Sequence, residues 1–169
     1  MLLITNGTII DPKNHFEGKE DLLIGDDGRI LKRAPSGELS AEHVFDASGC
    51  IVAPGLVDTH SHFRDPGFTY KEDLHTGSLA AAAGGYTSVI LMANTNPPVD
   101  STEILTDILE RGRREQIHIY SAANVTKGMK GQEVNDLQAL AAAGAPVFTD
   151  DGKPILNEAV FTQALKEAD

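Results

Sequence analysis

Short apolar runs separated by turn-forming residues mark the first 53 residues of the chain. Asn6-Gly7 stands between the first two runs, and Gly-Asp-Asp-Gly at 25–28 stands between the next two. The runs that this pattern predicts as strands lie at 2–4, 8–10, 21–24, 29–31 and 44–46. Because these strands are short and joined by tight turns, the segment is predicted to form a small antiparallel β unit.

From residue 51 onward the pattern changes to strand, loop and helix in alternation. Near-continuous apolar runs predict strands at 51–60, 86–92, 118–121 and 146–149. The segments that follow these strands predict helices at 74–83, 102–114, 135–143 and 157–166, one with capping residues in front at 100–103 and two with glycines behind at 84–85 and 144. Continuously apolar strands that alternate with helices are typical of a parallel sheet covered by helices, so we predict the α/β class.

Two α/β architectures fit this alternation. A doubly wound sheet usually carries a glycine-rich phosphate loop after its first strand, and no such loop follows residue 60. Polar, chemically competent residues instead follow each predicted strand, which is where a (β/α)8 barrel places its active site. We therefore predict the first half of a (β/α)8, TIM-type barrel at 54–169, preceded by the β unit at 1–53.

Composition and charge argue against some classes of binding partner and of cellular location. The formal net charge is -11, which argues against nucleic acid or an anionic membrane as a partner. No apolar run approaches the roughly 20 residues of a membrane span, no secretion signal is recognisable, and the single Cys50 fits a reducing compartment. We expect a cytoplasmic protein in which Cys50 is buried and the basic cluster of Arg111, Arg113 and Arg114 lies on a solvated helix end.

His60 and His62 form the most informative motif. In a strand, side chains at i and i+2 point to the same face, so two imidazoles at the end of the 51–60 run can reach one metal ion together. Imidazole nitrogen suits zinc and neighbouring transition metals. A bare His-x-His pair more often has a structural role at a loop, so further residues must support the metal hypothesis.

Four later residues bear on that hypothesis. Arg64 continues the face of the histidines if the strand extends that far, and could grip a substrate carboxylate or pair with Asp58 or Asp65. Asn94 follows the second strand, where it is either a turn former or a substrate contact. Asp150 and Asp151 follow the fourth strand, and either they form a simple turn or one of them joins the metal centre.

Taken together, three segments resemble the dihydroorotases of the amidohydrolase superfamily, in their long bacterial type. The segments are Pro-Gly-Leu-Val-Asp-Thr-His-Ser-His-Phe-Arg-Asp-Pro-Gly at 54–67, Met-Ala-Asn-Thr-Asn-Pro-Pro at 92–98 and Phe-Thr-Asp-Asp-Gly at 148–152. The resemblance covers the whole chain and implies that 1–53 is part of a β-sandwich. It also implies reversible conversion of N-carbamoyl-L-aspartate to L-dihydroorotate in pyrimidine synthesis.

Site roles follow from the resemblance by motif position. It implies that His60, His62 and Asp151 ligate one or two zinc ions, and that Arg64 and Asn94 hold the substrate carboxylate. The choice of Asp151 over Asp150 rests on the motif alone. The family's catalytic aspartate is expected beyond Asp169, so the chain by itself is expected to be inactive.

Related functions remain as alternatives. Allantoinase and dihydropyrimidinase (hydantoinase) share this chemistry on cyclic amides, although the strings around Arg64 and Asn94 favour dihydroorotase. Some relatives of the enzyme are non-catalytic partners of aspartate carbamoyltransferase, and these typically lose their metal ligands. The resemblance leaves a homodimer and association with aspartate carbamoyltransferase open.

Overall fold

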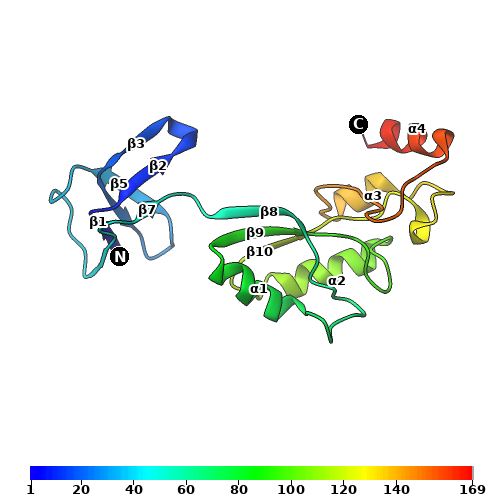
Figure 1. Cartoon of the computed structure of the whole chain (residues 1–169), viewed down its shortest axis with the longest axis horizontal. Helices are drawn as coiled ribbons and strands as arrows, with labels where there is room; N and C mark the ends of the chain where they lie inside the picture. The colour runs from blue at the N-terminus through cyan, green and yellow to red at the C-terminus, as the bar shows by residue number, and fades with distance from the viewer. Residues whose placement is uncertain (169) are drawn as a thin grey trace. The chain divides into compact units, whose positions relative to one another are not determined.

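Pro54 and Gly55 separate two structural units in the computed structural model, which describes residues 1–168. The first unit comprises Met1–Pro54 and the second Gly55–Asp169. Figure 1 shows the first unit as strands and loops in blue and cyan, and the second as alternating strands and helices. Each unit has its own sheets, so each is described separately.

The first unit contains two small sheets rather than one antiparallel unit. One has the order β5-β4-β1-β6, formed by Ile30–Ala34, Asp21–Ile24, Leu2–Thr5 and His43–Asp46. The other has the order β3-β2-β7, formed by Phe16–Lys19, Thr8–Asp11 and Ile51–Val52, with a 3-10 turn (Pro12–Asn14) between β2 and β3. The pairs β1–β6 and β2–β7 are parallel, so the antiparallel prediction is only partly correct.

The Asn6-Gly7 turn has a different function from the one predicted. It does not close a hairpin, because β1 and β2 belong to different sheets and the chain crosses between them at this point. Asn6 has a φ of 63°, and a Cβ on Gly7 would lie 2.6 Å from Val52 Cγ2. The chain therefore crosses between the two sheets through Asn6, which has a left-handed backbone, and Gly7, which has no room for a side chain. The turn at 25–28 does join an antiparallel pair, β4 and β5, as predicted.

Asp21 is a buried carboxylate in this unit. Its side chain accepts hydrogen bonds of 3.0 Å from the Ser36 hydroxyl and 3.0 Å from the Gly37 N–H, and the residue is 2% exposed. These donors satisfy the carboxylate and fix the segment that follows β5. Cys50, by contrast, is exposed, so the expectation of a buried thiol is wrong.

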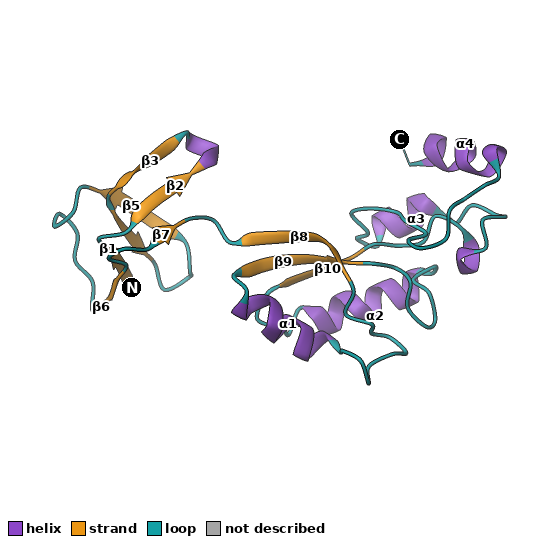
Figure 2. Ribbon diagram, in the orientation of Figure 1, coloured by secondary structure: helices purple, strands orange, loops and turns teal. Residues whose placement is uncertain are grey.

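The second unit is built on a parallel sheet, which confirms the α/β class. Its strand order is β10-β9-β8, formed by His118–Ser121, Tyr86–Leu91 and Leu56–Ser61. Helices α1 (Leu74–Ala83) and α2 (Thr102–Gly112) lie on the same face of this sheet in Figures 1 and 2. The chain continues through a 3-10 turn (Lys127–Met129), α3 (Leu137–Ala142) and α4 (Glu158–Glu167).

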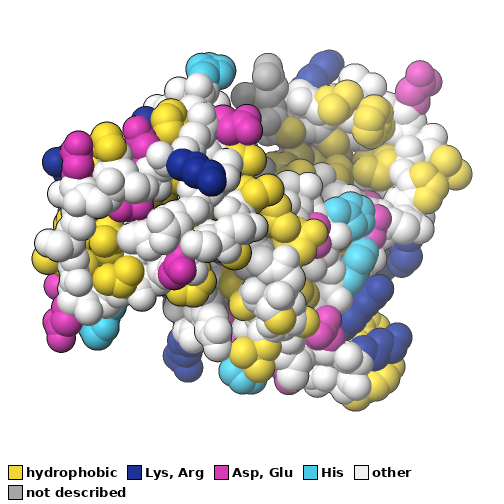
Figure 3. All heavy atoms as spheres, turned by 60° about the vertical axis from the view of Figure 1, so that its left-hand side comes forward, with side chains coloured by type: hydrophobic (Ala, Val, Ile, Leu, Met, Phe, Trp, Pro, Cys, Tyr) yellow, Lys and Arg dark blue, Asp and Glu magenta, His cyan; other side chains and the backbone are white. Residues whose placement is uncertain are grey.

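Alternation along β9 and β10 explains why the helices cover this face. Val89, Leu91 and Ile119 are buried and share one cluster with Leu105 and Ile108 of α2. Other strand residues are exposed, among them Leu56, Val57 and Tyr120, and Figure 3 shows hydrophobic side chains in yellow at the surface. No helix among the described residues is long and apolar enough to cross a membrane.

The structure confirms most predicted elements and corrects two. The predicted helix at 74–83 coincides with α1, while α2 and α3 are shorter than predicted. The predicted strand at 51–60 is interrupted at 53–55, where Pro54 lacks an N–H and the chain passes from β7 to β8. The predicted strand at 146–149 forms only an isolated parallel bridge between Phe148 and Ala123.

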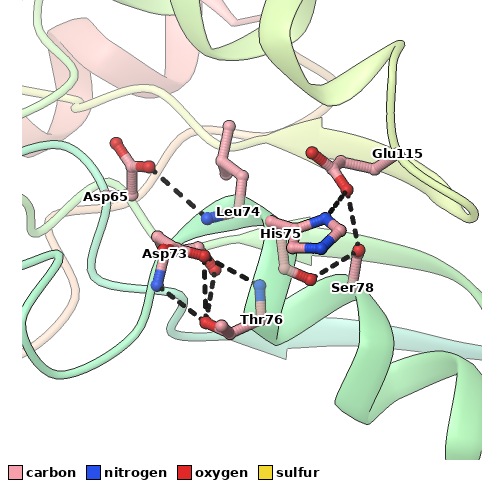
Figure 4. Close-up of polar contacts among 7 residues, drawn as sticks. All are labelled: Asp65, Asp73, Leu74, His75, Thr76, Ser78 and Glu115. Carbon is pink, nitrogen blue, oxygen red and sulfur yellow. Dashed lines mark hydrogen bonds and ion pairs between the residues drawn. The ribbon is translucent and has the colours of Figure 1, made fainter.

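A capping box starts α1. The Asp73 carboxylate accepts hydrogen bonds from the Thr76 N–H (2.8 Å) and the Thr76 hydroxyl (3.0 Å), as Figure 4 shows. These hydrogen bonds lower the pKa of Asp73 below its ordinary value. Further contacts hold the start of α1: the Glu115 carboxylate accepts hydrogen bonds from His75 Nδ1 (2.9 Å) and Ser78 Oγ (3.0 Å), which ties α1 to the segment before β10.

Candidate metal centre

The two histidines of the motif stand at the end of β8. His60 is within the strand and His62 follows its last residue, Ser61, at the carboxyl edge of the parallel sheet. Their ring centroids are 5.3 Å apart, and their side chains are 58% and 29% exposed. The i and i+2 spacing therefore brings both imidazoles to one accessible place, as the sequence predicted.

Asp151 completes a group of three. Its Oδ1 lies 3.5 Å from His60 Nε2, and its Oδ2 lies 3.5 Å from His62 Nε2. One ligand atom from each residue lies within 4.8 Å of the others, so the three residues could hold a metal ion. Two imidazole nitrogens and a carboxylate oxygen are donors that zinc accepts, and a half-exposed position leaves room for further ligands. The residues present therefore fit a metal of this kind.

Asn94 links two members of this group. It follows β9, where its Nδ2 donates to Asp151 Oδ2 at 2.9 Å and its Oδ1 lies 3.1 Å from His62 Nδ1. The reversed amide would set its oxygen against the carboxylate, so the orientation with Nδ2 toward Asp151 is the favourable one. His62 Nδ1 then donates the hydrogen bond, and its Nε2 faces Asp151 Oδ2.

Asp150 is turned away from the histidines. Its Oδ1 accepts from the N–H groups of Val125 (2.9 Å) and Thr126 (3.2 Å), and its Oδ2 accepts from the Thr126 hydroxyl. The residue is 7% exposed. A buried carboxylate engaged by three donors is not free to bind a metal at the surface. This gives a physical reason for preferring Asp151, which the sequence did not supply.

Comparison with known proteins places the chain in a family. The family model described as "Dihydro-orotase-like" matches residues 49–169. The chain belongs to the dihydroorotase-like family. Dihydroorotases from Streptococcus pyogenes serotype M3 and Clostridium acetobutylicum are 51% and 48% identical to it, over 97% and 99% of the chain. The chain spans about 40% of the length of these curated relatives, 39% and 40% respectively.

Solved structures of hydantoinases share the fold. The L-hydantoinase of Arthrobacter aurescens superimposes with a TM-score of 0.78 at 19% identity, covering 98% of this chain and 38% of that one. A D-hydantoinase from Thermus sp. gives a TM-score of 0.68 at 24% identity, covering 99% of this chain and 38% of that one. At these identities the likeness concerns the fold alone.

Arg64 does not continue the strand face of the histidines. In this dihydroorotase-like chain β8 ends at Ser61, and Arg64 has a φ of 61°, so the period-2 argument fails at this residue. Neither of its predicted salt-bridge partners engages it. Asp58 accepts a hydrogen bond from the His60 N–H, and Asp65 binds Arg111 instead. Among the described residues, no ion pair joins Arg64 to a carboxylate.

The ion pair between Asp65 and Arg111 was not predicted. Both guanidinium nitrogens of Arg111, Nη1 and Nη2, donate to the Asp65 carboxylate at 2.9 Å, and Asp65 is 5% exposed. These hydrogen bonds raise the pKa of Arg111. The expectation that Arg111 lies on a solvated helix end is therefore only partly correct: its side chain is 37% exposed, but α2 also uses it to hold the loop that follows His62. Arg113 and Arg114 are exposed, as expected.

Gly67 connects the loops after β8 and β9. Its φ is 91°, and a Cβ there would lie 1.9 Å from the Asn96 carbonyl oxygen. The Asn96 N–H also donates to the Pro66 carbonyl at 3.2 Å. The loop that carries Arg64 is therefore packed directly on the loop that carries Asn94. A Pro-Gly pair predicts a turn, but it does not reveal such a contact in the sequence.

Proposed function

We propose that the complete protein is a zinc-dependent dihydroorotase that interconverts N-carbamoyl-L-aspartate and L-dihydroorotate in de novo pyrimidine synthesis. Membership of the dihydroorotase-like family and about 50% identity to curated dihydroorotases support this function. The observation that carries the proposal is the convergence of His60, His62 and Asp151 at the carboxyl edge of the parallel sheet. His60 and His62 lie at the end of β8, and Asp151 reaches them from a loop 89 positions beyond His62, so side chains that suit zinc meet here from two separate segments.

In this proposal His60 and His62 bind zinc through Nε2, and Asp151 binds it through its carboxylate, with one or two ions held. Bound zinc supplies Lewis-acid activation of water and of the ring amide carbonyl. Asn94 keeps the proton of His62 on Nδ1, so that Nε2 is available as a ligand. The same amide restrains the Asp151 carboxylate through its Nδ2.

Arg64 and Asn94 are the residues proposed to hold the substrate carboxylate. Arg64 is half-buried and has no carboxylate partner among the described residues, which leaves its guanidinium available for two parallel hydrogen bonds to a substrate. Asn94 is already engaged by His62 and Asp151. Arg64 is therefore proposed as the main residue that binds the substrate carboxylate, and Asn94 as a further contact to the same group.

The finer architecture is part of the same proposal. Residues 1–53 would form part of a β-sandwich, and residues 54–169 the first four β/α units of a (β/α)8 barrel. The fold likeness to hydantoinases and the three parallel strands with α1 and α2 on one face support this assignment. A cytoplasmic location, a homodimer and association with aspartate carbamoyltransferase are proposed for the complete protein by the same resemblance.

Substrate turnover tests the function directly. The protein expressed from its complete gene should hydrolyse L-dihydroorotate and close N-carbamoyl-L-aspartate, with allantoin and hydantoin turned over far more slowly. Faster turnover of allantoin or hydantoin would reassign it to those cyclic amidases. A protein that binds no metal and turns over none of the three would instead support the non-catalytic partner of aspartate carbamoyltransferase.

A further inference from the structure

Asp150 lies where a short parallel pairing of two chain segments ends. The Ala123 N–H donates to the Val147 carbonyl at 3.1 Å, and the Thr149 N–H donates to the Ala123 carbonyl at 2.9 Å. In a regular parallel ladder the next bond would join the Val125 N–H to the Thr149 carbonyl. That bond is replaced, because the Val125 N–H donates to Asp150 Oδ1 at 2.9 Å. The Asp150 side chain thus replaces the Thr149 carbonyl as the acceptor for the Val125 N–H.

The replacement lets the chain leave the pairing and turn. The Thr149 carbonyl is taken by Asn124 Nδ2 at 3.2 Å, and the Asp150 carbonyl accepts the Lys153 N–H at 2.8 Å. Asp151, at the start of this turn, therefore projects toward the histidines instead of continuing a strand. The backbone of Asp151 takes no part in this pairing, so its position depends on how firmly Asp150 is held and on the hydrogen bond that Asn94 Nδ2 donates to its carboxylate.

Asp150 is held by a second layer of contacts. Thr126, whose N–H and hydroxyl both donate to the carboxylate, is 0% exposed. The Thr126 hydroxyl oxygen also accepts the Gly131 N–H at 2.9 Å, which fixes the direction of its proton toward Asp150. A buried carboxylate with three donors is costly to disturb, because each donor would be left without a partner.

We propose that Asp150, clamped by Val125 and Thr126, is a positioning residue that sets the metal-binding geometry of Asp151. The inference rests on the proposed zinc site. His60 lies in β8 and His62 directly after its last residue, whereas Asp151 reaches them from a loop across the site. Loosening the clamp would let the Asp151 carboxylate sample positions away from the histidine Nε2 atoms, so zinc affinity would fall although every ligand is still present.

The test measures zinc affinity by competition with a chromophoric chelator, using the protein expressed from its complete gene. Asp150→Asn keeps the size of the side chain but sets an amide donor against the Thr126 hydroxyl, and we expect roughly tenfold weaker zinc binding. Thr126→Val should weaken binding in the same direction, while Thr126→Ser, which keeps the hydroxyl, should stay close to wild type. If Asp150→Asn does not fold, the comparison of Thr126→Val with Thr126→Ser still tests the proposal.

Asp21→Asn is the matched control. Asp21 is equally buried and accepts the same two kinds of donor, a hydroxyl and a backbone N–H, but it lies in the first unit. This variant should lose stability and keep wild-type zinc affinity. Unchanged zinc affinity in both Asp150→Asn and Thr126→Val, with a zinc-binding wild type, would overturn the positioning role alone. A wild type that binds no zinc would overturn the proposed function, and this inference with it.

Discussion

Asn94 Oδ1 lies 3.1 Å from His62 Nδ1, while Nδ2 of the same amide lies 2.9 Å from Asp151 Oδ2. One side chain thus restrains two candidate metal ligands that are 89 positions apart in the chain. The contact to the carboxylate fixes which end of the amide is the oxygen. The oxygen in turn requires a proton on Nδ1 of His62, so the neutral imidazole carries its lone pair on Nε2.

Removal of this amide should weaken metal binding. We expect Asn94→Ala to reduce zinc affinity roughly tenfold, because both ring and carboxylate lose their orientation. Asn94→Asp should be worse than Asn94→Ala, because a second carboxylate would face Asp151. Chelator competition measures both. Thr95→Ala is the control, since its hydroxyl bonds only the Pro97 carbonyl and the variant should bind zinc as wild type does. Equal affinity in Asn94→Ala and Thr95→Ala would rule out the restraint.

The local sequence pattern predicted the candidate site residues and the nearby helix, but not the long-range contacts that hold them in place. The two-residue spacing of His60 and His62 places both on one face of a strand, and Gly84-Gly85 marks the end of the helix at 74–83, so neighbouring residues are enough to identify both. The Asp65–Arg111 and Asp150–Thr126 contacts join residues 46 and 24 positions apart, and nothing in either local segment indicates its partner. Arg64 was misplaced because β8 ends three residues earlier, at a point the apolar pattern does not mark.

The ion pair of Arg111 with Asp65 should contribute measurably to stability. Arg111→Leu leaves the Asp65 carboxylate buried without its partner, which typically costs about 3–5 kcal/mol for a fully buried pair. Because the Arg111 side chain is 37% exposed, water can partly replace it, and we expect a loss near or below the lower end of that range. Urea unfolding measures the change. Arg114→Ala, an exposed neighbour, should leave the free energy of unfolding unaltered, and a similar loss in both variants would contradict the account.

Gly67 should tolerate no side chain. Gly67→Ala introduces both the left-handed strain of about 1–2 kcal/mol and a clash with the Asn96 carbonyl, whose oxygen lies 1.9 Å from the new Cβ. Gly85→Ala is the matched control, because Gly85 has a φ of 82° and open space around its Cβ position. Gly85→Ala should be destabilised only by the left-handed backbone strain. A Gly67→Ala variant as stable as Gly85→Ala in thermal unfolding would show that the two loops do not pack as described.

Low pH should remove the stabilisation that the Asp73 carboxylate gives to the start of α1. The pKa of Asp73 is lowered in the folded protein by its hydrogen bonds with Thr76, so its stabilising effect is present above the ordinary value of 3.8 and is lost as the pH falls through the lowered pKa. Asp73→Ala should therefore be less stable than wild type near pH 7 and equal to it in strong acid. Urea unfolding across that pH range measures the difference. Glu110→Ala, which removes an exposed carboxylate of α2, should show no such convergence.

Anomalous diffraction at the zinc edge, from crystals of the complete protein grown with zinc, tests the central claim most directly. The account predicts a zinc peak within about 2.0–2.2 Å of the Nε2 atoms of His60 and His62 and of an Asp151 carboxylate oxygen. The Asp150 carboxylate should remain on Val125 and Thr126. A crystal with no zinc at these residues, or with zinc bound by Asp150 in place of Asp151, would contradict it.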